Sequence, residues 1–156
     1  MYVLRRFFVF MNKSNLDKKY YAHSRAGTPP AEWHLLKDHL ESVGKKASRF
    51  AANFGSSHWG YLAGFWHDLG KYSKEFQGML FAANGIDAHI ETKPGRVDHS
   101  TAGAQYAVRL LGDKGKLIAY AIAGHHAGLP NGCDNKTSCL TARLKKEIHD
   151  YSRCLI

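Results

Sequence analysis

One apolar segment constrains the fold of this 156-residue chain more than any other. Residues 59–69 are apolar almost all round and stop at Gly70, which is typical of a helix that is buried on every side. Such a helix lies inside a core, so His67 and Asp68 in its last turn are expected inside the protein too. An imidazole and a carboxylate turned toward one point would suit a metal ion.

Five further helices are predicted from apolar residues that recur at steps of three and four. In the first, residues 31–54, the expected buried face consists of Leu36, Leu40, Val43, Ala47, Phe50 and Phe54. The others cover residues 73–83, a segment opened by residues 98–101, residues 116–127, and residues 140–155 with Leu140, Leu144, Ile148, Tyr151 and Leu155 facing inward. Since no segment shows a convincing strand pattern, the sequence predicts an all-α fold.

Composition limits the possible partners and compartments. Lys and Arg outnumber Asp and Glu by 22 to 13, giving a net charge of +9 with neutral histidines, so a polyanion is a reasonable partner. No apolar run approaches the ~20 residues of a membrane-spanning helix. Three cysteines without close paired spacing (Cys133, Cys139 and Cys154) favour free thiols in a reducing cytoplasm over a disulfide framework or a zinc ribbon.

Histidines carry the strongest chemical signal. His39 follows Leu36 by three residues and therefore projects from the buried face of its helix or from its margin. The adjacent pair His125 and His126 is hard to explain as packing, because each imidazole brings two nitrogens that need partners. The candidate metal ligands are His39, His67, Asp68, His99, His125 and His126.

This ligand set indicates a transition metal. Imidazole and carboxylate ligands suit zinc, manganese, iron, nickel or cobalt, whereas magnesium and calcium sites are richer in oxygen. Six candidates exceed the needs of one tetrahedral ion, and the two oxygens of Asp68 can bridge two ions. The sequence therefore favours a two-metal centre of the kind that activates water and stabilises phosphoryl transfer.

Several motifs together resemble the HD superfamily of metal-dependent phosphohydrolases, and more narrowly the HD nuclease domain of the CRISPR-associated helicase-nuclease of type I systems. They are YAHS at 21–24, WHLLKDHL at 33–40, HDLGKYSKEFQ at 67–77, DHSTAGA at 98–104 and GHHAGLPNG at 124–132. The resemblance covers roughly residues 20–132 and implies an HD-domain helical bundle with a metal site in its core.

The resemblance also implies an activity. The implied activity is endonuclease and 3′-to-5′ exonuclease cleavage of single-stranded DNA. The implied cofactors are two divalent transition-metal ions (manganese, iron, nickel or cobalt), and the implied partners are a CRISPR surveillance complex and a helicase domain or subunit. Carried over by position, His39, His67 and Asp68 would hold one ion, and Asp68, His99, His125 and His126 the other. Lys71 would face a substrate phosphate; its alternative role is that of a solvated lysine at a helix C-terminus.

The chain departs from the family pattern at its end. The family completes the first metal site with an aspartate on a later helix, and Asp150, on the last predicted helix, lies too early for that role. We expect a tail at residues 1–20, a nuclease domain at 21–156 without its last helices, and no helicase domain. A non-catalytic module that binds DNA or the surveillance complex, and a nucleotide or cyclic-nucleotide phosphohydrolase, are the alternatives. His23 precedes the first helix and is expected to be either a residue that supports the ligands or a loop residue, rather than a ligand itself.

Overall fold

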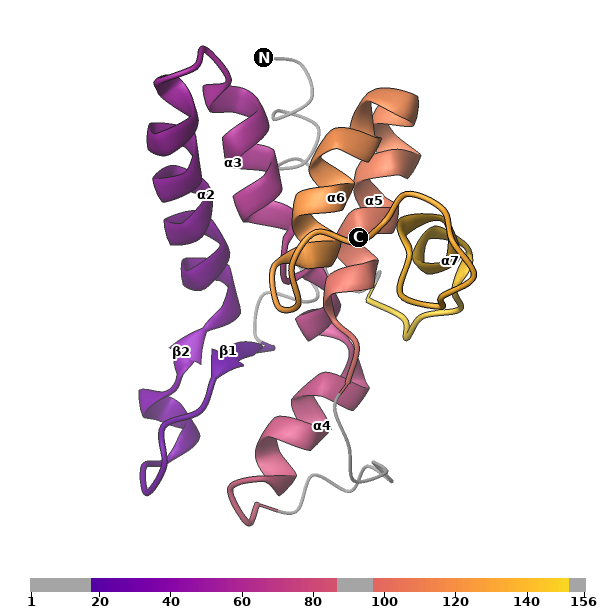
Figure 1. Ribbon diagram of the computed structural model, residues 1–156. Coiled ribbons are helices and arrows are strands. Elements are labelled where there is room, and N and C mark those ends of the chain that lie inside the picture. Colours follow the sequence, from indigo (N-terminus) through magenta and orange to yellow (C-terminus); the bar gives the residue numbers. More distant parts are fainter. Residues whose placement is uncertain (1–17, 87–96, 152–156) are drawn as a thin grey trace.

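A computed structural model describes residues 18–86 and 97–151, which form a bundle of helices with one small sheet (Figure 1). The all-α prediction is therefore confirmed. In chain order the elements are β1 (Tyr21–His23), the 3₁₀ helix η2 (Pro30–Glu32), β2 (His34–Leu35), α2 (Leu36–Ala52), α3 (Ser57–Trp66), the 3₁₀ helix η3 (Leu69–Tyr72), α4 (Lys74–Ala82), α5 (Ser100–Leu111), the 3₁₀ helix η4 (Gly112–Lys114), α6 (Gly115–Gly124) and α7 (Leu140–Lys145).

Two antiparallel helix pairs make up most of the bundle. Helix α2 packs along α3, and α5 packs along α6, with α3 also touching α5 and α6 (Figure 1). Gly55, at a φ of 70°, turns the chain from α2 into α3, a backbone conformation that glycine adopts without strain. Trp66 and Leu69, 2% and 1% exposed, lie in the core between the pairs, but the helix is not buried on every side as predicted, because Tyr61, Leu62 and Phe65 are only partly buried.

A short two-stranded sheet precedes α2 and was not predicted. Strand β1 pairs antiparallel with β2, and the backbone N–H of Leu36 donates to the carbonyl of Tyr20 at 2.8 Å. Strands of three and two residues are too short to show an alternating pattern. Because the sheet takes up the residues before Leu36, α2 begins five residues later than the predicted start of the helix at Ala31.

Helices α3, α6 and α7 end earlier than predicted. The first two stop at Trp66 and Gly124, so the histidines that follow them lie in turns just beyond the helix ends. The final helix stops at Lys145 because the next residue, Lys146, is extended (φ −66°, ψ 137°). Ile148 and Tyr151 still pack on the core, but from irregular backbone.

Phe50 and Phe54 contradict the predicted buried face of α2. Each is 73% exposed, whereas Leu36 and Leu40 on the same predicted face are 0% and 1% exposed.

Most of the predicted tail at 1–20, most of the predicted loop at 84–97, Cys154 and Leu155 lie outside the described residues. Cys133 and Cys139 are free thiols, as predicted. Within residues 18–86 and 97–151, no helix has both the length and the apolar character needed to cross a membrane.

Candidate metal centre

Asp68 lies where the polar residues of the core converge. It sits in the turn between α3 and η3, is 2% exposed, and belongs to two groups of side chains whose ligand atoms lie within 4.8 Å of one another. One group contains His39, His67 and Asp68; the other contains Asp68, His99, His125 and His126. The five predicted histidine ligands are thus brought together around the carboxylate of the sixth, Asp68.

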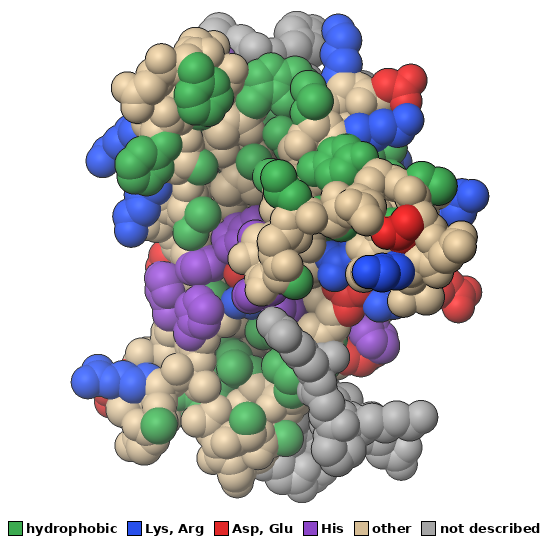
Figure 2. Space-filling model, in the orientation of Figure 1, with side chains coloured by type: hydrophobic (Ala, Val, Ile, Leu, Met, Phe, Trp, Pro, Cys, Tyr) green, Lys and Arg blue, Asp and Glu red, His purple; other side chains and the backbone are tan. Residues whose placement is uncertain are grey.

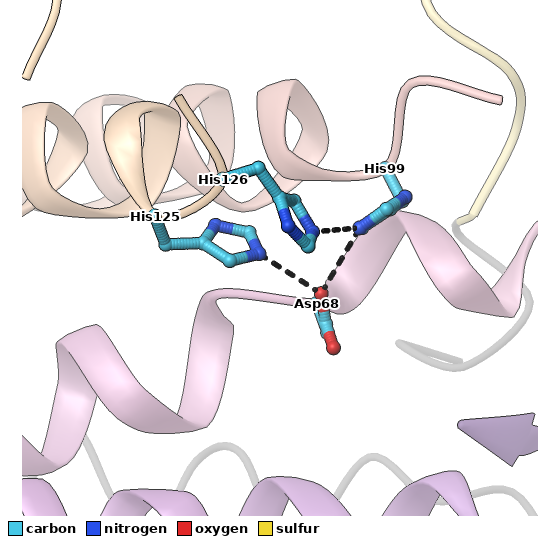
Figure 3. A group of neighbouring side chains, drawn as sticks. All are labelled: Asp68, His99, His125 and His126. Atoms are coloured by element: carbon cyan, nitrogen blue, oxygen red, sulfur yellow. Dashed lines mark hydrogen bonds and ion pairs between the residues drawn. The ribbon is translucent and has the colours of Figure 1, made fainter. Parts of the chain in front are cut away.

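The group with three histidines gathers around Oδ1 of Asp68 (Figure 3). The Nε2 atoms of His99 and His125 each lie 3.4 Å from this oxygen. His126 approaches His99 instead, with 2.7 Å between their Nε2 atoms. His99 directly precedes α5, while His125 and His126 directly follow α6, so this group forms where two neighbouring helices begin and end.

The other group gathers around Oδ2 of Asp68. The Nε2 atoms of His39 and His67 lie 3.2 Å and 3.0 Å from this oxygen and 3.2 Å from each other. His39 comes from the first turn of α2, and His67 follows the last residue of α3. The two oxygens of one carboxylate therefore face two different sets of imidazoles.

Backbone carbonyls fix the orientation of three of these imidazoles. The Nδ1 atom of His67 lies 2.7 Å from the Gly64 carbonyl, that of His99 lies 3.0 Å from the Val97 carbonyl, and that of His125 lies 2.7 Å from the Ile122 carbonyl. Since a carbonyl can only accept, Nδ1 must carry the proton in each ring. In the neutral form of each ring the lone pair therefore lies on Nε2, which is the arrangement of metal-binding histidines in proteins, whereas a proton held on Nε2 instead can be donated to Asp68.

The charge states around Asp68 also suit a cation. Burial by itself would raise the pKa of this carboxyl group, but the imidazoles of His125, His39 and His67 outweigh it and hold the pKa well below its usual range. Burial lowers the pKa of His99 to about 4, despite the neighbouring carboxylate. At neutral pH Asp68 is therefore an anionic carboxylate, and the ring of His99 beside it is neutral.

An unsatisfied oxygen supports the same conclusion. Oδ1 of Asp68 is buried and has no hydrogen-bond donor among the residues that the structure describes. Buried carboxylate oxygens without a donor are costly, because they lose water and gain nothing in return. A divalent ion between this oxygen and the Nε2 atoms would satisfy both, so the residues present fit a metal.

Lys71 is buried, which rules out the solvated alternative. Its side chain is 6% exposed, and its ammonium lies 2.9 Å from Oδ2 of Asp68 and donates to the carbonyl of Ala22 at 3.1 Å. The lysine therefore pairs with the central carboxylate and ties β1 to η3. Its contact with a substrate phosphate stays a prediction.

Gln77 is a supporting residue whose role the sequence did not reveal. Its Oε1 accepts from the Tyr21 N–H at 3.0 Å, and its Nε2 donates to the carbonyls of Tyr21 at 2.9 Å and Lys71 at 2.7 Å. These bonds hold β1 beside the site and place His23 on a strand rather than in the predicted loop. The His23 ring centroid lies 5.0 Å from that of His39, but His23 belongs to neither group of ligand atoms.

Two glycines allow the elements of the site to approach each other. A Cβ on Gly70 would collide with the backbone of His99, and a Cβ on Gly103 would collide with the carbonyl of Trp66. The Gly70 N–H donates to the His99 carbonyl at 3.2 Å. The glycines of HDLGK and DHSTAG are therefore needed for close contact between η3, α3 and α5, which brings His99 to Asp68.

Helix α7 holds the start of α5 and the end of α6 together. Arg143 Nη1 donates to Oγ of Ser100 at 3.1 Å and to the carbonyl of Ala123 at 2.6 Å. One guanidinium therefore links the start of α5, next to His99, to the end of α6, next to His125. Nearby, Lys146 pairs with Asp98 at 2.7 Å. Burial opposes ionisation of Asp98, but this lysine and the first turn of α5 lower its pKa to about 2.

The group around Oδ2 has one carboxylate and two imidazoles. Within residues 18–86 and 97–151, no further ligand joins His39, His67 and Asp68. Asp150 is exposed and lies in irregular backbone rather than on the predicted last helix. That Asp150 takes no part in the first site stays a prediction.

Comparison with known protein families gives a match over most of the chain. The family model described as "Cas3, HD domain" matches residues 19–153, which extends beyond the stretch of motifs recognised in the sequence and includes α7. No curated protein matches the chain.

Proposed function

Because the chain belongs to the family of Cas3 HD domains, which are CRISPR-associated metal-dependent nucleases, we propose that it cleaves single-stranded DNA in CRISPR interference. Endonuclease and 3′-to-5′ exonuclease action are both part of this proposal. The observation that carries it is Asp68, whose two buried oxygens each face a separate set of histidine nitrogens.

Two divalent transition-metal ions are the proposed cofactors, with manganese, iron, nickel and cobalt as candidates. His39, His67 and Asp68 would hold one ion, and Asp68, His99, His125 and His126 would hold the other. Bound there, the ions would supply Lewis-acid activation of water and neutralise charge on the phosphodiester.

The protein's own residues prepare the site for this chemistry. The carbonyls that accept from Nδ1 orient the imidazoles, and the low pKa of His99 keeps its ring neutral near pH 7. Lys71 balances the charge of Asp68, and we propose that its ammonium also faces a phosphate of the substrate. The excess of basic residues, with a net charge of +9, supports binding of a polyanion.

The proposal is tested by digestion of circular single-stranded DNA with added manganese, cobalt or nickel. The expected result is cleavage by the protein and none by Asp68→Ala. Asp38→Ala is the matched control, because Asp38 is an exposed aspartate on α2, next to His39 in sequence. Intact DNA after incubation with metal-loaded protein would contradict the proposal.

A non-catalytic module is the second candidate, and the three-ligand group around Oδ2 favours it. Metal analysis separates the two functions. Two equivalents of metal per chain are expected for the nuclease, and one for a module that has lost the first ion. Partnership with a CRISPR surveillance complex and with a helicase domain or subunit is proposed for either case.

A further inference from the structure

Two exposed aromatic side chains at the end of α2 have no role in the core. Phe50 and Phe54 are each 73% exposed, and neither contributes to the metal centre. Two exposed phenylalanines four residues apart, one in the last turn of α2 and one just after its end, need an explanation, because water contact with an aromatic ring is unfavourable. Their surroundings indicate what covers them.

The neighbours of Phe50 along the helix are basic. Lys46 precedes it by one turn, Arg49 precedes it directly, and both side chains are exposed. Neither has an ion-pair partner in the part of the chain that the structure describes, whereas Lys45 pairs with Glu41 at 3.2 Å. Exposed rings flanked by unpaired cations are typical of surfaces that bind single-stranded nucleic acids.

Phe50 also lies on the side of α2 that carries His39, while Phe54 lies in the turn just after the helix. Phe50 follows His39 by eleven residues, close to three full turns of ~3.6 residues, so both occupy the same flank of the helix. Lys46 lies between them on that flank, about two turns from His39. Figure 2 shows hydrophobic side chains over the upper end of α2, basic side chains along its edge and histidines below them, on one face of the molecule.

We propose that this flank of α2 binds the single strand as it enters the metal centre. Phe50 and Phe54 stack on bases, while Lys46 and Arg49 contact the phosphates. The inference rests on the proposed nuclease function and adds a binding surface to it. A nucleic acid fits better than a protein partner, because lysine is depleted from the cores of protein interfaces and here stands one turn from the rings.

The helix sets the distance between stacking and cleavage. Eleven residues correspond to ~16 Å of helix axis between His39 and Phe50. At ~3.4 Å per nucleotide in a stacked strand, this distance spans about five nucleotides, and fewer if the strand is extended. An oligonucleotide of two nucleotides is therefore too short to reach both Phe50 and the metal centre.

Binding of fluorescent oligodeoxythymidine to metal-free protein tests the surface without cleavage. We expect Phe50→Ala and Phe54→Ala each to weaken binding by about 5- to 150-fold, the range for loss of one stacked base. Leu117→Ala is the matched control: Leu117 is 72% exposed and lies on α6, so its loss should leave affinity unchanged.

Two further measurements separate stacking from charge. On an abasic oligonucleotide, Phe50→Ala should bind as well as the unmodified protein, because no base is present to stack. Lys46→Gln should reduce the slope of log affinity against log salt by about 1, whereas the phenylalanine variants leave the slope unchanged.

The inference is overturned if the double variant Phe50→Ala/Phe54→Ala binds a ten-nucleotide strand as tightly as the unmodified protein does. A protein partner would then be the remaining occupant of this surface. An equal loss of affinity in Leu117→Ala would also overturn the inference. The outcome is independent of the proposed activity. If stacking is observed but metal-loaded protein cleaves nothing, the surface stands and the nuclease proposal fails.

Discussion

Asp68→Asn separates the role of this carboxylate in folding from its role in metal binding. Lys71 is 4% exposed and pairs with Asp68 at 2.9 Å, so the substitution leaves its ammonium buried without a counter-charge. Removal of one partner from a buried ion pair costs about 3–5 kcal/mol. The free energy of unfolding of the metal-free protein should fall by about that amount, which is a decrease of about 2 M in the urea midpoint for a slope of ~2 kcal/mol per M.

A double variant completes the test. Asp68→Asn/Lys71→Met removes both charges and should recover most of the lost stability, because no unpaired ion remains in the core. Its metal content should nevertheless stay near zero, since both groups of ligands share Asp68. Urea denaturation and metal analysis on the same preparations measure the two effects. Asp38→Asn, an exposed aspartate on α2, is the control for loss of one negative charge.

Two results would refute this reasoning. If Asp68→Asn is as stable as the unmodified protein, the carboxylate does not hold the charge of Lys71. If the double variant still binds two ions, Asp68 is not the ligand that both groups share. Either result would remove the basis for a bridged two-metal site.

Three other predictions concern the surroundings of the ligands. The metal-free protein should lose stability as the pH falls from 6.5 to about 4. In this window His99 takes up a proton in the unfolded chain but not in the folded protein, where its pKa is lowered. Thermal denaturation over this pH range should show a smaller loss of stability in His99→Gln. Arg143→Met should lower the affinity of the group around Oδ1 for manganese about tenfold in a calorimetric titration. Lys145→Met, which changes an exposed residue of the same helix, should leave this affinity unchanged. Gln77→Ala should lower the free energy of unfolding by about 1–3 kcal/mol because it leaves buried backbone groups without partners, and exposed Lys74→Ala should not.

Apolar periodicity predicted where the helices lie but not how far each is covered. Leu36 and Leu40 are buried as expected, whereas Phe50 lies on the same predicted stripe and is exposed. Periodicity defines a stripe along a helix, while burial depends on the neighbour opposite each turn. Gly60 at the start of α3 packs against Ala47 and Ala51, so the two helices are in contact up to the last turn of α2, and Ala51 is buried while the adjacent Phe50 stays exposed.

The ends of elements were the least predictable part of the fold. The final helix stops at Lys145, where the sequence pattern continues, because Lys146 uses its carbonyl to accept from Gln105 and its ammonium to pair with Asp98. These are contacts between residues more than 40 positions apart. No local pattern contains that information.

The clustering of the candidate ligand side chains was predictable because their chemistry lacks a packing explanation. Adjacent histidines at His125 and His126, and a carboxylate at the end of an apolar helix, need partners wherever the chain folds. The supporting residues gave no such signal. Gln77 and Arg143 act through backbone atoms 56 and 20 residues away, and an isolated glutamine or arginine on a helix is ordinary in sequence.

Asp68 joins the two helix pairs as well as the two groups of ligands. Its Oδ2 faces histidines from α2 and the end of α3, while its Oδ1 faces histidines from the start of α5 and the end of α6. Both oxygens turn with one side-chain torsion, so a cation that fixes Oδ1 also fixes the direction of Oδ2. Gly70 and Gly103 keep the two helix pairs in contact at this point, which leaves the carboxylate little freedom to serve one group alone. We therefore expect the two groups to take up metal cooperatively, and the contact between the helix pairs to tighten as they do.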